Sequence, residues 1–320
     1  MVVSSKGGGF LAVWSNQARC PILFPTTIKP EGASFLNTRA GFRNIPPPAA
    51  GRFIHPAMMP EKPQPPTELT ERGDTLRIAL VRHGETFQNR GHVVQGQDPT
   101  YGRLTEAGIR QAALVGEALA GRHFDVVYCS PLERAVLTMG MILVPRPGDR
   151  TLPLVFADPL REIHQGMLHG RPHSEWKAAM DGKDPMTFQS PGGESWIDVQ
   201  NRVTRYFQEA ILPSVHREIL IVAHGGVNRG LIASLTGMTM GDSWAGPGIG
   251  APQDNTCIND LVVDREGRLL WALVNDSSHL LGEFEGAGHG QLWHAEGGRW
   301  ELLGPQAERQ DGRAEFNPFG

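Results

Sequence analysis

The chain has 320 residues, of which 40% are hydrophobic, and a formal net charge of −4. It can therefore bury a sizeable core, and it lacks the basic excess expected of a protein whose main partner is a nucleic acid or an anionic membrane. Its three cysteines, Cys20, Cys129 and Cys257, are too few and too scattered for a disulfide framework, and no apolar run approaches the roughly 20 residues that span a bilayer. We expect a soluble, cytoplasmic protein that contacts neither nucleic acid nor membrane.

Residues 1–73 differ in composition from the rest of the chain. They hold 11 of the 25 prolines, and up to residue 60 Glu31 is the one acidic residue against six basic ones. No hydrophobic period is sustained, which predicts a proline-rich, disordered extension. Two alternatives stay open: an acid-poor, basic start is also typical of an organelle transit segment, and the stretch could precede a true start at Met58 or Met59.

From residue 74 onward, strand-like and helix-like segments alternate. Thr105 is expected to cap a helix that Gly121 ends, and Ser130-Pro131-Leu132-Glu133 has the pattern of a capping box. The predicted strands are residues 76–81, 124–129 and 219–223, and the predicted helices are 105–121, 130–144, 195–212 and 226–235. A Gly/Pro-rich loop (237–255) and a hairpin (256–263 with 269–274) follow.

This alternation predicts an α/β domain over residues 74–304, with residues 305–320 as a flexible tail. We expect a single doubly wound, mainly parallel sheet with helices on both faces. In such sheets, ligands bind beyond the carboxyl ends of the strands.

Two histidines follow predicted strands in matching contexts. Arg82-His83-Gly84 comes directly after one strand, and His224-Gly225-Gly226 after another. A third loop places Arg134 in the first turn of a helix. Because guanidinium groups grip phosphate with paired hydrogen bonds, these residues predict a pocket for a phosphate dianion, and the flanking glycines allow close backbone approach.

These motifs, with several others in a fixed order, carry a family resemblance. The chain resembles branch 1 of the histidine phosphatase superfamily, which is also called phosphoglycerate-mutase-like. The matching stretches are Arg82–Thr86 with Asn89, Gln95-Gly96, Leu104–Gly108 with Gln111-Ala112, Ser130–Leu132 with Arg134-Ala135, Leu160–Gly166, Gly192–Ser195, Ala223–Gly226 and Asn275–Leu280.

The resemblance implies a three-layer sandwich and a role for each matching residue. His83 stands where the family has the nucleophile that forms a phosphohistidine, and Glu162 stands where it has the proton donor. Arg82 and Arg134 match the arginines that hold the phosphoryl oxygens, and His224 matches the second histidine. Asn89 and Gly225 are expected to contact substrate. No metal and no cofactor are expected, and a homo-oligomer is left open.

Some of these residues have plainer interpretations. Glu162 has Glu175 and Glu194 as neighbours in sequence, and glutamates are usually surface groups. His164, His169 and His173 suggest a metal site, but their spacing is loose and substrate contact or a solvated loop is favoured. Packing is favoured for Trp176, Trp196 and Trp244, and a buried position for Cys129.

The favoured function is a metal-independent phosphomonoester hydrolase acting on a small phosphorylated metabolite. The paired arginines and longer insert of cofactor-dependent phosphoglycerate mutases are not apparent between Arg171 and Ser190. A mutase-type phosphotransferase is the first alternative, and a non-catalytic phospho-ligand-binding module is the second. The loop 237–255 is expected to overhang the pocket.

Overall fold

The main sheet determines where the candidate residues lie. The structure is a computed structural model that describes residues 3–4, 10–13, 22–25, 62–100, 102–144, 152–241, 249, 252–296 and 299–303. Its described residues form an eight-stranded mixed sheet in the order β11-β10-β9-β8-β4-β7-β5-β6. The parallel strands are β4 (Thr75–Arg82), β7 (Glu218–Ala223), β5 (Val126–Cys129) and β6 (Leu154–Phe156). The antiparallel strands are β8 (Ile258–Asp264), β9 (Leu269–Asp276), β10 (Gln291–Glu296) and β11 (Arg299–Leu303).

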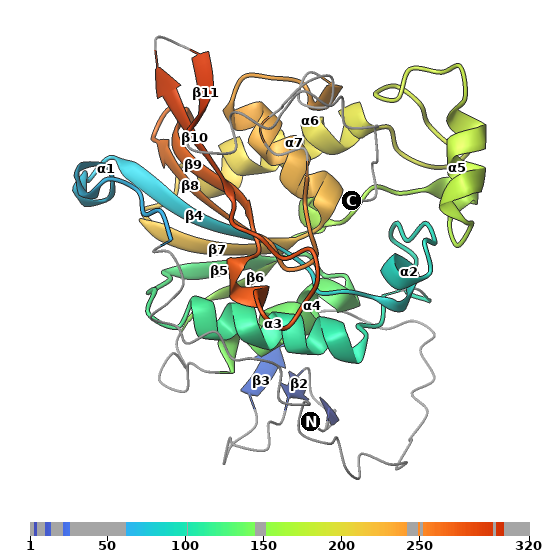
Figure 1. Cartoon of the computed structure of the whole chain (residues 1–320), viewed down its shortest axis with the longest axis horizontal. Helices are drawn as coiled ribbons and strands as arrows, with labels where there is room; N and C mark the ends of the chain where they lie inside the picture. Colours follow the sequence, from blue (N-terminus) through green and yellow to red (C-terminus); the bar gives the residue numbers. More distant parts are fainter. Residues whose placement is uncertain are drawn as a thin grey trace. The chain divides into compact units, whose positions relative to one another are not determined.

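Helices lie on both faces of this sheet. Figure 1 shows α3 (Glu106–Ala118) and α4 (Glu133–Leu143) on one face and α6 (Trp196–Tyr206) and α7 (Gly225–Leu235) on the other. The predicted α/β fold with three layers is therefore confirmed. Two shorter helices are present: α2 (Phe87–Arg90) follows β4, and α5 (His173–Met180) precedes α6.

The chain divides into two compact units, and the sheet belongs to the second, which begins at Glu61. This unit includes α1 (Thr67–Glu71), ahead of the start predicted at residue 74. The first unit contains a small antiparallel sheet of β1 (Val3–Ser4), β2 (Phe10–Val13) and β3 (Ile22–Pro25). The rest of 1–61 and the tail 305–320 lie outside the described residues, so the predicted disorder of both stays a prediction.

Most predicted elements form where the sequence places them, with one informative exception. Thr105 does cap α3, since its hydroxyl accepts a hydrogen bond from the Gly108 N–H at 2.9 Å. The capping box predicted at Ser130 is wrong: Leu132 occupies the cap position of α4 without a side-chain cap. The Ser130 hydroxyl instead accepts from the Leu132 N–H at 3.3 Å and contacts His224 at 2.7 Å, so it joins the start of the helix to a distant histidine.

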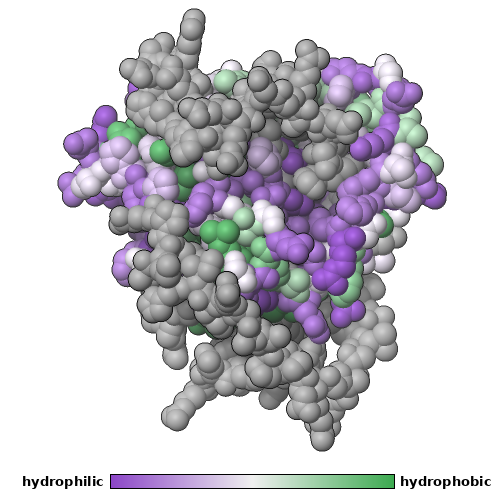
Figure 2. All heavy atoms as spheres, in the orientation of Figure 1, coloured by the Kyte–Doolittle hydropathy of each residue, from purple (hydrophilic) through white to green (hydrophobic). Residues whose placement is uncertain are grey.

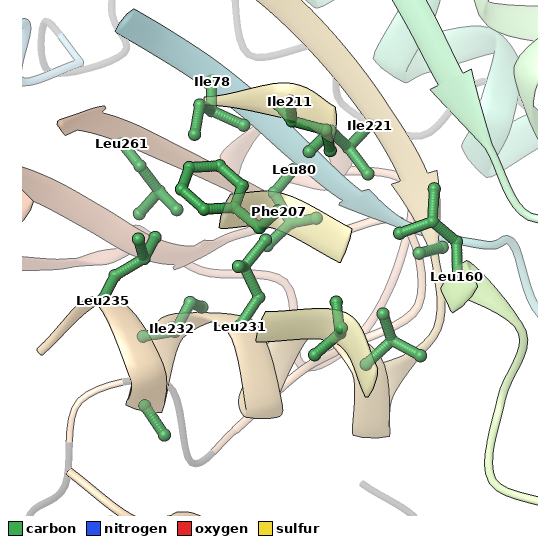
Figure 3. Packing of buried hydrophobic residues seen from close by; sticks show 14 of the residues in the cluster. Ile78, Leu80, Leu160, Phe207, Ile211, Ile221, Leu231, Ile232, Leu235 and Leu261 are labelled. Atoms are coloured by element: carbon green, nitrogen blue, oxygen red, sulfur yellow. The ribbon is translucent and has the colours of Figure 1, made fainter. Parts of the chain in front are cut away.

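The core lies between the sheet and helices α6 and α7. Phe207 opens a five-residue π-helical turn (Phe207–Ile211) that extends α6, and Figure 3 shows its ring between Ile78 and Leu80 of β4 and Leu231 of α7. These residues are at most 2% exposed. Strands that helices cover on both faces have continuous apolar sequences, which explains the composition of β4 and β7.

The described surface is largely polar. On the face seen in Figure 2, hydrophilic residues predominate and hydrophobic residues gather only in small groups. Among the described residues, no helix has the length and apolar character that crossing a membrane requires.

His279, whose ring nitrogens are buried, contributes to the pH dependence of stability. Neither ring nitrogen of His279 has a hydrogen-bond partner among the described residues, and burial lowers its pKa to about 4 against the usual 6.5. Nearby Asp276 opposes this shift and Lys62 adds to it. Below pH 6.5 the unfolded chain binds a proton that the folded ring does not, so stability falls as the pH drops from 6.5 towards 4.

We predict that His279→Gln removes part of this acid sensitivity. Urea unfolding at pH 7.5 and pH 4.5 should show a smaller loss for the variant, by on the order of 2–3 kcal/mol. The control is His123→Gln, which changes an exposed histidine. Equal pH dependence of the two variants would contradict this role of His279.

Candidate active site

The register of the central strands brings the two predicted histidines together. Arg82 of β4 pairs with Ala223 of β7 in parallel register, so the next residues, His83 and His224, emerge side by side. Their ring centroids are 5.2 Å apart. The His83 N–H donates to the Ala223 carbonyl at 3.1 Å, which links the two strand ends directly.

Hydrogen bonding fixes which nitrogen of His83 carries a proton. Its Nδ1 lies 2.8 Å from the Gly84 carbonyl oxygen, and because a carbonyl can only accept, Nδ1 must donate. Burial, with the charges of Arg134 and Arg82, lowers the pKa of His83 well below its usual range, so the ring is neutral. Nε2 therefore holds a lone pair at neutral pH, as a nucleophile requires.

His224 has the opposite tautomer. The Arg134 Nε donates to its Nδ1 at 3.2 Å, since a guanidinium cannot accept, so Nε2 carries the proton and donates to the Ser130 hydroxyl. Ser130 reaches this position because its N–H bonds to the Val222 carbonyl beside His224. The fully buried His224 ring thus lies behind Arg134 and orients it, together with the Gly96 carbonyl, which accepts from Arg134 at 2.8 Å.

Three buried arginines line one pocket. Arg82, Arg134 and Arg229 are at most 7% exposed, and desolvation lowers the pKa of each, to about 10 for Arg134 and Arg229. All three stay charged at neutral pH. Glu162 is the acidic group on the same pocket wall, so the described wall carries an excess of positive charge. Such a cluster is stable only with an anion or with fixed dipoles around it, and a phosphate supplies the geometry that guanidinium groups match best.

The loop after His83 is held in place by close packing. A Cβ on Gly84 would lie 2.5 Å from the Gly108 carbonyl oxygen, so the absence of a side chain lets this loop pack on the start of α3. The Asn89 side-chain oxygen accepts from the N–H and hydroxyl of Thr86 and from the Asn255 amide. Its own amide nitrogen is then the end available to donate to a ligand in the pocket that Asn89 lines.

Glu162 alone among the three neighbouring glutamates lines the pocket. Its carboxylate accepts from the Ile163 N–H at 2.9 Å and the Gly226 N–H at 3.3 Å, which aim it at the phosphate side. Glu194 instead pairs with Arg202 at 2.8 Å, and Glu175 lies exposed on α5. The predicted acid is thus the one carboxylate of the three in a position to exchange protons with a bound ligand.

The pocket brings together most of the residues predicted from sequence. Arg82, His83, Asn89, Arg134, Glu162 and Gly225 all line it, whereas His224 lies behind Arg134 and does not. His173 also lines it, whereas His164 is exposed. The described residues contain no group of three or more His, Cys, Asp or Glu side chains that could hold a metal ion.

The remaining predictions divide between core and pocket. Trp176, Trp196 and Cys129 are buried, as packing predicts, although the Trp196 ring also borders the pocket. Trp244 and much of the loop 237–255 lie outside the described residues.

The sequence patterns do not reveal the roles of two members of the site. Ser130 has the pattern of a helix cap, and Arg229 lies outside the matching motifs. Arg229 is the only charged residue in α7 (Gly225–Leu235), whose other members are small, apolar or amide side chains. A lone cation in such a helix, five residues after a predicted active-site histidine, was the available signal.

Comparison with known proteins agrees with this geometry. The family model of the histidine phosphatase superfamily (branch 1) matches residues 78–276. The chain belongs to this superfamily. A phosphoglycerate mutase of Schizosaccharomyces pombe is 33% identical over 181 residues, covering 53% of this chain and 83% of that protein. A glucosyl-3-phosphoglycerate phosphatase of Mycolicibacterium vanbaalenii is 33% identical over 181 residues, covering 52% of this chain and 77% of that protein.

A solved structure of the superfamily gives the same fold. The alpha-ribazole phosphatase from Shigella flexneri has a TM-score of 0.52 and 29% identity to this chain, covering 61% of this chain and 93% of that one. An adenosylcobalamin/alpha-ribazole phosphatase of Escherichia coli is 32% identical over 184 residues, covering 53% of this chain and 83% of that protein. The family match spans strands β4 to β9 and the residues that line the pocket, and the similar proteins include both phosphatases and mutases.

The arginine cluster predicts tight binding of a tetrahedral anion. Replacing Arg134 with Met keeps most of the side-chain volume and removes the charge, so inorganic phosphate should bind roughly 100-fold more weakly in calorimetry. The control, Arg161→Met, removes a guanidinium that pairs with Asp158 outside the pocket, and it should leave phosphate binding unchanged. Equal phosphate affinity in the two variants would contradict the proposed anion site.

Proposed function

We propose that this protein is a metal-independent phosphomonoester hydrolase that acts on a small phosphorylated metabolite through a phosphohistidine intermediate. The observation that carries the proposal is the neutral His83, with its Nε2 lone pair, in a pocket lined by three buried arginines and Glu162. Membership of the superfamily and its named phosphatases supports this assignment.

In the first step, His83 Nε2 attacks phosphorus and the bond from phosphorus to the ester oxygen breaks. The leaving alkoxide takes a proton from Glu162, which enters this step as the acid. The imidazole becomes cationic as it binds the phosphoryl group, and the Gly84 carbonyl, which accepts a hydrogen bond from Nδ1–H, stabilises that charge. Arg82 and Arg134 neutralise the charge that develops on the phosphoryl oxygens, and Asn89 and the Gly225 backbone contact the bound group.

In the second step, water attacks the phosphohistidine. Glu162, now a carboxylate, takes a proton from that water, and the P–N bond breaks to release phosphate and neutral His83. His224 keeps Arg134 oriented throughout, and its ring lies beside that of His83. Both steps use groups already aimed at the pocket, so little reorganisation is required.

The competing function is a mutase-type phosphotransferase, because similar proteins include mutases. It differs in the fate of the phosphohistidine, which would pass to a second substrate hydroxyl instead of water. The complete set of nucleophile, arginines and acid argues against a non-catalytic phospho-ligand-binding module.

We also infer a cytoplasmic protein that needs neither nucleic acid nor membrane, consistent with Cys129 and Cys257 being buried free thiols.

The nucleophile assignment predicts the effect of His83→Ala. With EDTA present to remove metal ions, phosphate release from p-nitrophenyl phosphate should fall at least about 1,000-fold, while the melting temperature changes little. The control, His123→Ala, alters an exposed histidine and should retain activity. Activity retained in His83→Ala would refute the nucleophile, and conversion of 3-phosphoglycerate to 2-phosphoglycerate without phosphate release by the wild type would establish the mutase instead.

The acid assignment predicts a dependence on the leaving group. Glu162→Gln should lower kcat/KM by about 100-fold for an alkyl phosphate and by less than about 10-fold for p-nitrophenyl phosphate, whose leaving group needs little protonation. Glu175→Gln, on the exposed surface of α5, is the matched control. Equal losses on both substrates would point to another acid.

A further inference from the structure

Beyond the phosphate-binding groups, the pocket wall consists of uncharged side chains. Gln95, Gln165 and His173 line it, together with the apolar Val93 and Ile163. This is the part of the pocket that must hold the rest of the substrate. Its hydrogen-bonding pattern therefore bears on which class of alcohol the phosphate is attached to.

The two glutamine amides are held in opposite orientations. The Trp176 indole N–H, which can only donate, bonds to the Gln165 side-chain oxygen at 3.2 Å, so the amide nitrogen of Gln165 is the end left to donate. The Gln95 amide nitrogen donates to the Thr86 hydroxyl oxygen, whose own proton goes to Asn89. The side-chain oxygen of Gln95 is then the end left to accept.

His173 adds a neutral ring to this wall. Burial lowers the pKa of His173 to about 4, although a hydrogen bond to the Val93 backbone opposes this shift. The charges that act on it come from His92 and Lys177, and none of the three pocket arginines is among the causes of its shift. Its own backbone N–H, at the start of α5, donates to the His92 carbonyl at 2.9 Å, so that helix end is already occupied.

A wall that offers both donors and acceptors without charge suits hydroxyl groups. A hydroxyl donates and accepts, whereas a carboxylate only accepts and loses its hydration unless a cation replaces it. The cations of the described lining are Arg82, Arg134 and Arg229, and Arg229 lies close enough to Arg82 and Glu162 for their charges to act on it.

We infer that the alcohol released by this enzyme is an uncharged, hydroxylated molecule of the sugar or polyol class, whose hydroxyls are bound by Gln95, Gln165 and His173. The inference rests on the proposed hydrolase function and extends it to the substrate class. Substrates whose carbon chain carries a carboxylate as well as the phosphate, such as phosphoglycerates, are disfavoured at this site.

Two substrates that differ in one group test this directly. Glycerol 3-phosphate carries a hydroxymethyl group where 3-phosphoglycerate carries a carboxylate, and p-nitrophenyl phosphate reports the hydrolase reaction without hydroxyls. We expect kcat/KM for glycerol 3-phosphate to exceed that for 3-phosphoglycerate by at least about tenfold. With p-nitrophenyl phosphate hydrolysed, an equal or reversed ratio overturns the substrate class and leaves the proposed function intact. No hydrolysis of p-nitrophenyl phosphate overturns the function itself.

Two variants locate the preference in this wall. Gln165→Leu removes the amide and should lower the ratio of kcat/KM for glycerol 3-phosphate to that for p-nitrophenyl phosphate by about tenfold. His173→Lys adds a cation and should raise kcat/KM for 3-phosphoglycerate relative to glycerol 3-phosphate by about tenfold. Ser174→Lys adds the same charge at the next, exposed position and is its control. If both wall variants leave these ratios unchanged, the residues named here do not select the substrate; if either variant fails to fold, the wild-type ratio alone decides.

Discussion

The desolvation of three guanidinium groups is the constraint on which the site depends. Arg82, Arg134 and Arg229 are buried together, and water can stabilise their charges only poorly there. Fixed acceptors offset part of this cost: the Gln253 carbonyl accepts from Arg82, and the Gly96 carbonyl and His224 accept from Arg134. A bound phosphoryl dianion would offset the rest of the desolvation cost of the arginines. The pocket is therefore arranged for an anion before any substrate enters, and this preorganisation is what electrostatic catalysis of phosphoryl transfer requires.

Burial and the same positive charge together explain the state of the histidines. Desolvation, and after it the charges of Arg134 and Arg82, lower the pKa of His83 and of His224, so both rings stay neutral. Their tautomers are then decided by neighbours with fixed roles, the Gly84 carbonyl for His83 and the Arg134 Nε for His224. Two chemically identical side chains are thus held differently: His83 keeps a lone pair on Nε2, and His224 accepts a hydrogen bond from Arg134 on Nδ1.

The sheet supplies the required precision. β4 lies between β7 and β8, so the residues at its end are held from both sides: His83 N–H bonds to Ala223, and the His83 carbonyl accepts from the Thr256 N–H and the Asn255 amide. Segments that are 94 residues apart in the chain, at Ser130 and His224, meet because β5 and β7 are parallel neighbours. The ends of buried strands move less than loops do, which keeps the groups within hydrogen-bond distance.

The sequence predicted the parts of the structure that local patterns determine. The central strands and helices α3, α4, α6 and α7 have strong periodicity or clear ends, and the paired His–Gly junctions placed both histidines at one sheet edge. The contact of Ser130 with the site could not be predicted, because its local pattern favours a helix cap while its hydroxyl bonds to a histidine distant in the chain. α5 was missed because Trp176 is its one buried residue, which leaves no apolar period to read. The opposite orientations of Gln95 and Gln165 depend on Thr86 and Trp176 and could not be predicted from sequence.

The central claim is that His83, Arg82 and Arg134 close around one phosphoryl group, and a crystal structure with vanadate tests it most directly. Vanadate adopts the five-coordinate geometry of phosphorus in transfer. We predict vanadium bonded to His83 Nε2 at one apex, with the guanidinium groups of Arg82 and Arg134 on its equatorial oxygens and Glu162 beside the opposite apex. Vanadate bound elsewhere, or bonded to a different residue, would contradict the account.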